Sequence, residues 1–173
     1  ALGRQLAKLP IDPRLGRMVL AAQALSCLEE VLVIAAALAI QDPRERPADK
    51  QSQADQMHVR FRHERSDFMA WLALWRYYEE QRQALTQSQL RKLCQREYLS
   101  FLRMREWRDM HAQLRIACRQ LGLRLGGEVS DAAGETFEPI HRALLAGLLS
   151  NIAQHQENRD YLGSRNRKFF FFF

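Results

Sequence analysis

The sequence predicts an all-α fold, a helical bundle, and two observations support this prediction. Apolar residues recur at three-and-four spacing in one segment after another, and clusters of Gly, Pro and polar residues separate these segments. With 47% hydrophobic and 27% charged residues, the 173-residue chain has the composition of a globular domain with one core. Its longest apolar run, Val31–Ile40, is about half of the ~20 residues that a membrane-spanning helix needs, so we expect no membrane association.

Two helices and a loop are expected in the first part of the chain. Pro13 follows Asp12 and opens a helix, because the first helical turn tolerates proline. A second helix is expected over Leu28–Ile40, and since it is apolar on nearly every face we expect it at the centre of the bundle. Pro43 and Pro47 then forbid regular helix and predict a stiff, partly extended loop.

The middle of the chain predicts a short helix and then an aromatic one. Asp55 is expected to cap a short helix that runs through Phe61. Ser66 and Asp67 provide the next helix start, with a hydroxyl at the cap and a carboxylate in the positive first turn. The residues behind them repeat at helical spacing and are expected in the core: Phe68, Trp71, Leu72, Trp75 and Tyr78.

A break is predicted near Ser100, within residues 88–121, a stretch that contains neither Gly nor Pro. Apolar residues before and after this point face directions that differ by roughly a third of a turn, so one straight helix could not bury both sets. Ser100 is expected to cap the second segment. After a glycine-rich loop, a last helix is expected over residues 136–154 with Pro139 in its first turn, and no strand is expected before residue 159.

Motifs of catalysis are absent from the sequence. It has no GxxxxGK[ST] phosphate loop and no GxSxG turn, and His58 and His63 lie five residues apart, which does not suit zinc on one helix face. Glu29-Glu30 and Glu79-Glu80 are interpreted as solvated helix surface, and His111 as a packing histidine with satisfied hydrogen bonds. The chain by itself is expected to be no enzyme and to hold no metal or cofactor.

The cysteines Cys27, Cys94 and Cys118 are widely spaced and odd in number. This pattern argues against a disulfide framework and against a CxxC zinc site. We interpret them as small buried hydrophobic residues in a reducing cytoplasm.

The net charge of +6 comes almost entirely from arginine, since only four of the 26 basic residues are lysine. Guanidinium groups bind phosphate bidentately and stack on bases, so this composition suits a nucleic-acid partner. Four arginines after the predicted break share one side of the helix and could follow a phosphate backbone: Arg105, Arg108, Arg115 and Arg119. The alternative is a solvated basic face that is partly paired with Glu106 and Asp109.

The proline-bounded loop is the sharper candidate for a nucleic-acid contact. It carries Arg44 and Arg46, and arginines on a stiff loop lose less entropy on binding than mobile ones. The alternative is a loop whose arginines are ion-paired with Asp42 and Glu45.

Three stretches, in order, resemble the region that follows the motor domains in DEAH/RHA helicases, in particular the bacterial HrpA branch. The first is Leu-Gly-Arg-Gln-Leu-Ala at residues 2–7 with Leu-Pro-Ile-Asp-Pro-Arg-Leu at residues 9–15. The second is Leu-Ala-Ile-Gln-Asp-Pro-Arg-Glu-Arg-Pro at residues 38–47, leading to Ser-Asp-Phe at residues 66–68. The third runs from Tyr-Leu-Ser-Phe at residues 98–101 to Gln-Leu at 113–114, followed by Ala-Leu-Leu-Ala-Gly-Leu-Leu at 143–149.

This resemblance implies a helical ratchet (helicase-associated) domain over residues 13–158. It further implies the end of a winged-helix domain in residues 1–12, and a linker with the start of an OB-fold in residues 159–173. The chain, which opens on Ala1 without an initiator Met, is then expected to be a piece of a longer cytoplasmic protein. Its motor lobes would bind ATP and Mg²⁺, and together with the OB-fold they would enclose single-stranded RNA, or DNA.

Under the helicase hypothesis, the candidate RNA-binding residues are Arg44, Arg46, Arg103, Arg105 and Arg108, and the residues of the structural motif are Pro13, Pro43, Pro47, Ser66 and Asp67. Two departures from the family pattern stand out. Where many relatives carry Asn-x-Arg, this chain has Ser-Phe-Leu at residues 100–102 and an arginine only at position 103. Phe169–Phe173 is a pure phenylalanine run at the place where a mixed strand should begin.

A second hypothesis is a free-standing helical adaptor that docks partner proteins and does not bind nucleic acid. Such an adaptor would expose the stripe of Trp71 and Trp75, or the face formed by residues 144–149, as a docking groove.

Overall fold

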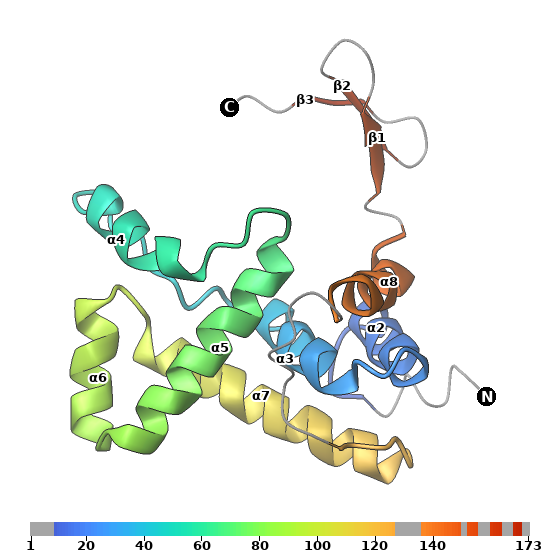
Figure 1. The fold of residues 1–173 in the computed structure, drawn as a ribbon, viewed down its shortest axis with the longest axis horizontal. Helices are drawn as coiled ribbons and strands as arrows, with labels where there is room; N and C mark the ends of the chain where they lie inside the picture. The colour runs from blue at the N-terminus through green and yellow to red at the C-terminus, as the bar shows by residue number, and fades with distance from the viewer. Residues whose placement is uncertain (1–8, 127–135, 150–151, 156–159, 164–167, 171–173) are drawn as a thin grey trace.

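The computed structural model describes residues 9–126, 136–149, 152–155, 160–163 and 168–170 (Figure 1). The helices, in chain order, are α2 (Pro13–Ala24), α3 (Leu28–Leu38), α4 (Gln51–His58), the short 3-10 helix η1 (Val59–Phe61), α5 (Asp67–Ala84), α6 (Gln87–Arg96), α7 (Phe101–Gln120) and α8 (Phe137–Leu148). Three short antiparallel strands follow in the order β1 (Ala153–His155), β2 (Asp160–Gly163) and β3 (Lys168–Phe170). The predicted all-α bundle is confirmed.

Helix α3 lies at the centre of the bundle, as predicted. Every residue from 28 to 37 is buried, so this helix has no face left for solvent. It packs against α2, α5, α7 and α8, which surround it in Figure 1. The helix ends at Leu38, two residues earlier than expected.

The start of α2 follows from the sequence of its first turn. Asp12 is the N-cap, and its Oδ1 accepts the backbone N–H of Arg14 at 2.8 Å, while Pro13 occupies the first helical position. The bond from the Arg14 backbone lowers the pKa of the Asp12 carboxyl. This helix start is therefore confirmed.

The break near Ser100 is also confirmed. Helix α6 ends at Arg96 and α7 begins at Phe101, with Ser100 at the N-cap position. Between them Tyr98 takes the left-handed backbone conformation, with φ of 55°, which reverses the chain sharply. Each helix can thus bury its own apolar face.

The aromatic stripe of α5 belongs to the core. Trp71 and Trp75 are each 8% exposed, and both rings lie against Trp107, at centroid distances of 5.4 Å and 5.1 Å. Trp107 is fully buried, and its indole N–H donates to the carbonyl oxygen of Val33 in α3 at 2.9 Å. This contact joins α3, α5 and α7.

Three expectations about element boundaries are wrong. Asp55 lies inside α4, which begins at Gln51, and its carboxylate pairs with Arg46 instead of capping a helix. The last helix ends at Leu148, six residues before the expected end, and β1 begins at Ala153, although no strand was expected before residue 159. A strand here satisfies its backbone groups by pairing with β2, which helical periodicity cannot reveal.

Some expectations concern the chain termini. Residues 1–8 lie outside the described residues, as do Phe171–Phe173 of the phenylalanine run, whereas Phe169 and Phe170 belong to β3. The winged-helix and OB-fold assignments stay predictions. No helix in the described part of the chain combines the length and the apolar character that crossing a membrane requires.

The pair Glu29-Glu30 is buried, so its interpretation as solvated surface is wrong. Each residue is 5% exposed, at the start of the central helix. Burial raises the pKa of Glu29, and Arg115 of α7 opposes that rise by donating to the Glu29 carboxylate at 2.6 Å. The other acidic pair differs, because Glu79 is half-buried while Glu80 is exposed.

All three cysteines are free and buried, which confirms their reading as small core residues. Burial raises the pKa of each thiol to about 11. A thiol with so high a pKa forms little thiolate at neutral pH and is therefore unreactive.

His111 is a packing residue, as predicted, but its hydrogen bonds are not all satisfied. Its ring lies 4.7 Å from that of Trp75, and its buried Nε2 has no hydrogen-bond partner among the described residues. Burial, aided by the positive charges of Arg115 and Arg108, lowers the pKa of His111 to about 4.

We therefore expect the fold to lose stability in mild acid through this group. Because the pKa of His111 is lower in the folded protein, the unfolded chain binds a proton more readily than the folded one. The free energy of unfolding is therefore at its full value above pH 6.5 and decreases as the pH falls towards about 4. Replacing His111→Leu should flatten this part of the pH profile, by up to about 3 kcal/mol at its acid end. Urea unfolding of both proteins at neutral pH and near the middle of that window measures the difference. The prediction would be contradicted if the unfolding free energies of the wild type and of His111→Leu differed by the same amount at both pH values.

Gly147 permits the close contact between α8 and α2. A Cβ at this position would lie 2.3 Å from the backbone oxygen of Arg14 and 2.7 Å from Cγ of Met18. The glycine in the Ala-Leu-Leu-Ala-Gly-Leu-Leu motif thus serves helix packing.

We predict that Gly147→Ala destabilises the protein by about 1–3 kcal/mol, because backbone must move to admit the methyl group. The sign is the opposite of the usual gain of about 1 kcal/mol for this change within a helix. Gly126→Ala is the matched control, since a Cβ there meets nothing within 4 Å. Thermal and urea unfolding check the prediction, and a stabilised Gly147→Ala would contradict it.

Candidate nucleic-acid interface

The proline-bounded loop, residues 41–47, is fastened to the turn between α6 and α7. The N–H of Glu45 donates to the Tyr98 oxygen and the N–H of Ser100 donates to the Pro43 oxygen, both at 2.8 Å. Arg44 and Leu99 form an isolated antiparallel bridge between these two bonds. The expected non-helical loop is confirmed, and its conformation is held by a partner more than fifty residues away in the chain.

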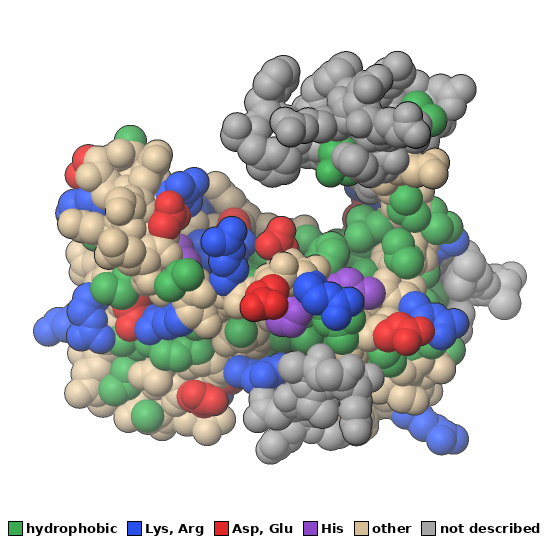
Figure 2. All heavy atoms as spheres, turned by 45° about the horizontal axis from the view of Figure 1, so that its top comes forward, with side chains coloured by type: hydrophobic (Ala, Val, Ile, Leu, Met, Phe, Trp, Pro, Cys, Tyr) green, Lys and Arg blue, Asp and Glu red, His purple; other side chains and the backbone are tan. Residues whose placement is uncertain are grey.

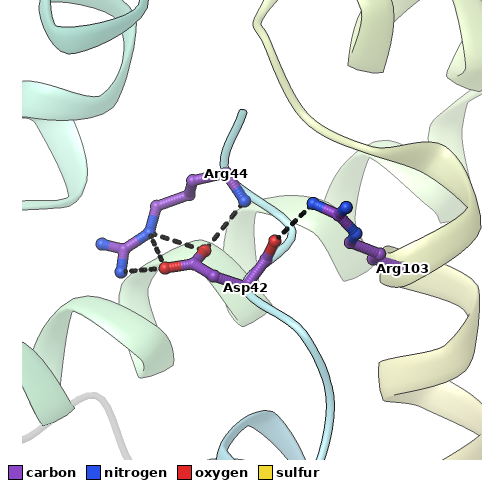
Figure 3. A network of polar contacts seen from close by, with 3 residues as sticks. All are labelled: Asp42, Arg44 and Arg103. Atoms are coloured by element: carbon purple, nitrogen blue, oxygen red, sulfur yellow. Dashed lines mark hydrogen bonds and ion pairs between the residues drawn. The ribbon is translucent and has the colours of Figure 1, made fainter. Parts of the chain in front are cut away.

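Asp42 bonds Arg44 of this loop and Arg103 of α7, as Figure 3 shows. Its carboxylate accepts the backbone N–H of Arg44 at 2.9 Å and the Arg44 guanidinium through Nε and Nη2, the latter at 2.8 Å. Its backbone oxygen accepts a bond from Nη1 of Arg103 at 3.0 Å. Arg103 thus reaches the loop from the first turn of α7.

The Arg44 guanidinium also lies over the ring of Trp71, at 4.4 Å from the centroid. This cation–π contact and the bidentate pair with Asp42 hold the side chain in one position. The ion pairing that the sequence left open as an alternative is present for Asp42, whereas Glu45 contributes a backbone N–H.

Arg46 makes a two-pronged pair with Asp55 of α4, with both N–O distances at 2.7 Å. Both side chains are more than half exposed, at 57% and 51%. Exposed pairs contribute at most about 1 kcal/mol, so an incoming phosphate can replace the carboxylate at little cost.

A hollow of about 350 Å³ lies between the loop, α4 and α5. Its polar lining includes Arg44, Asp55, His58, Arg62 and Asp67. Figure 2 shows Lys and Arg, Asp and Glu, and His side chains gathered together on the face that contains α4. The structural motif residue Asp67 therefore lies in the wall of this hollow.

The α4–η1 arm is tied down by Glu97, a residue that sequence reasoning missed. Glu97 is 6% exposed, and its carboxylate accepts the Tyr77 hydroxyl at 2.8 Å and pairs with the Arg60 guanidinium. Its backbone oxygen bonds Nε2 of His58 at 3.0 Å, and burial lowers the pKa of that histidine. No periodicity distinguishes Glu97 from a solvated glutamate at the end of a helix.

Ser66 occupies the N-cap position of α5, as predicted, but its hydroxyl makes no capping bond. Instead Oγ lies 2.6 Å from Nε2 of His141 in α8, whose ring stacks on Phe137 at a centroid distance of 4.0 Å. Ser66 thus joins the start of α5 to α8, a role that its sequence position does not reveal.

The arginines of α7 differ in their surroundings. Arg103 bonds the loop, while Arg105 and Arg108 line a second hollow with residues of α5 and α6. Arg115 is engaged by the buried Glu29, and Arg119 is exposed. The alternative of partial pairing is correct in kind, but the observed partners are Glu79 for Arg108 and Glu29 for Arg115, not the expected Glu106 and Asp109.

The chain is similar in sequence to a helicase-associated domain and to RNA helicases. Residues 12–71 match the family described as helicase associated domain (HA2), ratchet-like. Over 172 residues, 99% of the chain, it is 47% identical to the ATP-dependent RNA helicase HrpA of Escherichia coli and 45% identical to the HrpA homolog of Haemophilus influenzae. It is 31% identical over 156 residues to the DExH-box ATP-dependent RNA helicase DExH1 of Arabidopsis thaliana. The chain spans 13% of the length of the two bacterial relatives and 15% of the plant one.

We predict that Glu97→Ala destabilises the fold by about 1–3 kcal/mol, because it strands the half-buried Tyr77 hydroxyl and releases the α4–η1 arm. Glu80→Ala is the control, since Glu80 is exposed on α5 and should stay within about 0.5 kcal/mol. Urea unfolding gives both values. Hydrogen exchange should quicken in α4 for the Glu97 variant, and unchanged exchange there would contradict the tethering role.

Proposed function

From the confirmed resemblance to HrpA-type DEAH/RHA helicases and the ratchet-like helicase-associated domain at residues 12–71, we propose that the chain is the non-catalytic ratchet region of an ATP-dependent RNA helicase. In this role it lines the channel for single-stranded RNA, or DNA, and couples motor movement to translocation of the strand. The motor lobes of the same cytoplasmic parent protein bind ATP and Mg²⁺, and an OB-fold completes the channel.

One observation supports this proposal above the others: Asp42 and Asp55 hold Arg44 and Arg46 of the loop, residues 41–47, in fixed positions. Arg103 bonds the backbone of the same loop. A guanidinium that is already ordered loses little side-chain entropy when it binds. The bonds to Asp42 and Asp55 are exposed and can be exchanged for bonds to phosphate oxygens. Such contacts grip a strand without reading its sequence.

Coupling to the motor would follow from how the loop is attached. Its backbone is bonded at both flanks to the turn that begins α7, and α7 packs along the central helix α3. A displacement of the bundle would therefore carry the loop with it as one body.

Of the two docking surfaces considered under the adaptor hypothesis, only the face formed by residues 144–149 has exposed apolar side chains. Trp71 and Trp75 are buried, so their stripe is no docking groove. Leu145 of α8 and Leu149 at its C-cap are 45% and 58% exposed and leave an apolar face open. A docking role for that face is the second candidate function.

We expect the chain to bind a short oligouridylate weakly, with an affinity that falls steeply as salt rises. Each phosphate contact contributes about 0.7 to the slope of log affinity against log salt for single strands. The double variant Arg44→Gln/Arg46→Gln should lower this slope by about 1.4. Fluorescence anisotropy across a salt series measures it.

Arg17→Gln is the control, because Arg17 is exposed on α2 and its loss changes net charge without touching the loop. An equal change of slope in this control, salt-insensitive binding, or no binding at low ionic strength would count against the assignment. So would robust ATP hydrolysis by the pure chain.

A further inference from the structure

A second basic hollow, of about 250 Å³, lies where α5, α6 and α7 meet. Three arginines line it, Arg82, Arg105 and Arg108, and apolar side chains including Leu85, Leu90 and Phe101 form the rest of its wall. The loop of residues 41–47 takes no part in it. Figure 1 shows α6 and the first half of α7 around this corner of the bundle.

Positive charge is in excess in this hollow. Glu79 is the carboxylate that pairs with the cluster, and it is shared by two arginines: Arg82 through Nη2 at 2.9 Å and Arg108 through Nε at 2.8 Å. Arg105 is exposed and makes no ion pair or hydrogen bond with any residue that the structure describes. An anion entering the hollow would therefore meet uncompensated charge.

Glu79 also orders the arginines for a ligand. Its bonds to Arg82 use Nε and Nη2, and its ion pair with Arg108 is made at Nε. Because a guanidinium has five N–H donors, both side chains keep terminal N–H groups after these bonds. Two fixed guanidiniums with spare donors are preorganised for an oxyanion with several acceptor oxygens.

The apolar part of the wall strengthens this electrostatic attraction. Phe101 carries the guanidinium of Arg91 over its ring, at 5.3 Å from the centroid, and Leu90 is buried. Apolar walls exclude water and lower the local dielectric, so each charge–charge interaction becomes stronger.

We propose that this hollow is a binding site for a phosphate group, held by Arg82, Arg105 and Arg108. Its volume is below the roughly 300–1,000 Å³ of sites for drug-sized molecules, which suits a phosphate group better than a whole nucleotide. The phosphate belongs either to a free phosphate compound or to a nucleic-acid backbone.

This site is separate from the loop surface. Arg103 and Arg105 are two residues apart on α7, and such residues point to nearly opposite sides of a helix. Arg103 bonds Asp42 of the loop, whereas Arg105 faces α5 and α6. A phosphate at this hollow therefore does not depend on the channel role of the loop.

The test is titration of the 173-residue chain with inorganic pyrophosphate, uridine 5′-monophosphate and a short oligouridylate, in low-salt buffer without phosphate. Arg105→Gln should weaken pyrophosphate binding about tenfold, and Arg105→Gln/Arg108→Gln further, because each removes a charge-assisted hydrogen bond. Arg82 still neutralises Glu79 in both variants. Arg17→Gln removes the same charge from α2 and should have little effect.

The outcomes separate clearly. Binding of pyrophosphate or the nucleotide that depends on Arg105 supports the site with a free phosphate compound. Binding of the oligouridylate alone, with the same dependence, supports it with a nucleic-acid phosphate. Equal losses in Arg17→Gln, or no dependence of any probe on Arg105, would overturn the site.

The loop variant Arg44→Gln/Arg46→Gln distinguishes this proposal from the proposed function. It should leave pyrophosphate binding unchanged while it lowers the salt slope for the oligouridylate. If the loop variant weakens pyrophosphate binding, the separate phosphate site is wrong. If it leaves the salt slope for the oligouridylate unchanged, the role of the loop in the proposed function is wrong.

Discussion

Burial of α3 on all sides over residues 28–37 is the constraint on which the rest of the structure depends. A helix without a solvent face must be covered all round, and α2, α5, α7 and α8 each bury their apolar side to do so. Two glutamates at its start are buried with it, and one of them takes Arg115 from α7 as its partner. An unpaired buried carboxylate would cost far more than an exposed one, so this pair also orients α7 against α3.

The burial of its acidic partner determines whether an arginine is available to bind a ligand. Arg115 neutralises a glutamate that is 5% exposed, and it cannot leave without stranding that charge. Arg46 pairs with a half-exposed aspartate, so it can turn to another anion at small cost. Arg82 and Arg108 share Glu79 and keep spare N–H donors for another anion. The basic surface available to a ligand is therefore smaller than the net charge suggests, because Arg115 is held by a buried glutamate.

Features that depend on local chemistry could be predicted from the sequence. Asp12 and Pro13 start a helix by their own geometry, and two apolar faces in different directions require a break at Ser100 whatever surrounds them. Features that depend on distant partners could not. Glu29 pairs with Arg115, which is 86 residues away in the chain, and Glu97 pairs with Arg60, which is 37 residues away. In the sequence, neither glutamate differs from one on the surface of a helix. The loop was predicted from its prolines, whereas the turn that holds it was not.

The two basic surfaces are joined by the first turns of α7. Arg103 bonds the loop on one side, and Arg105 faces the α5–α6 hollow on the other. The turn at which α7 begins also holds the loop backbone, so α7 links the two surfaces. Under the proposed function, phosphates bound at both surfaces would move through the same distance when the bundle moves. In that case α7 would set the spacing between the two bound phosphates.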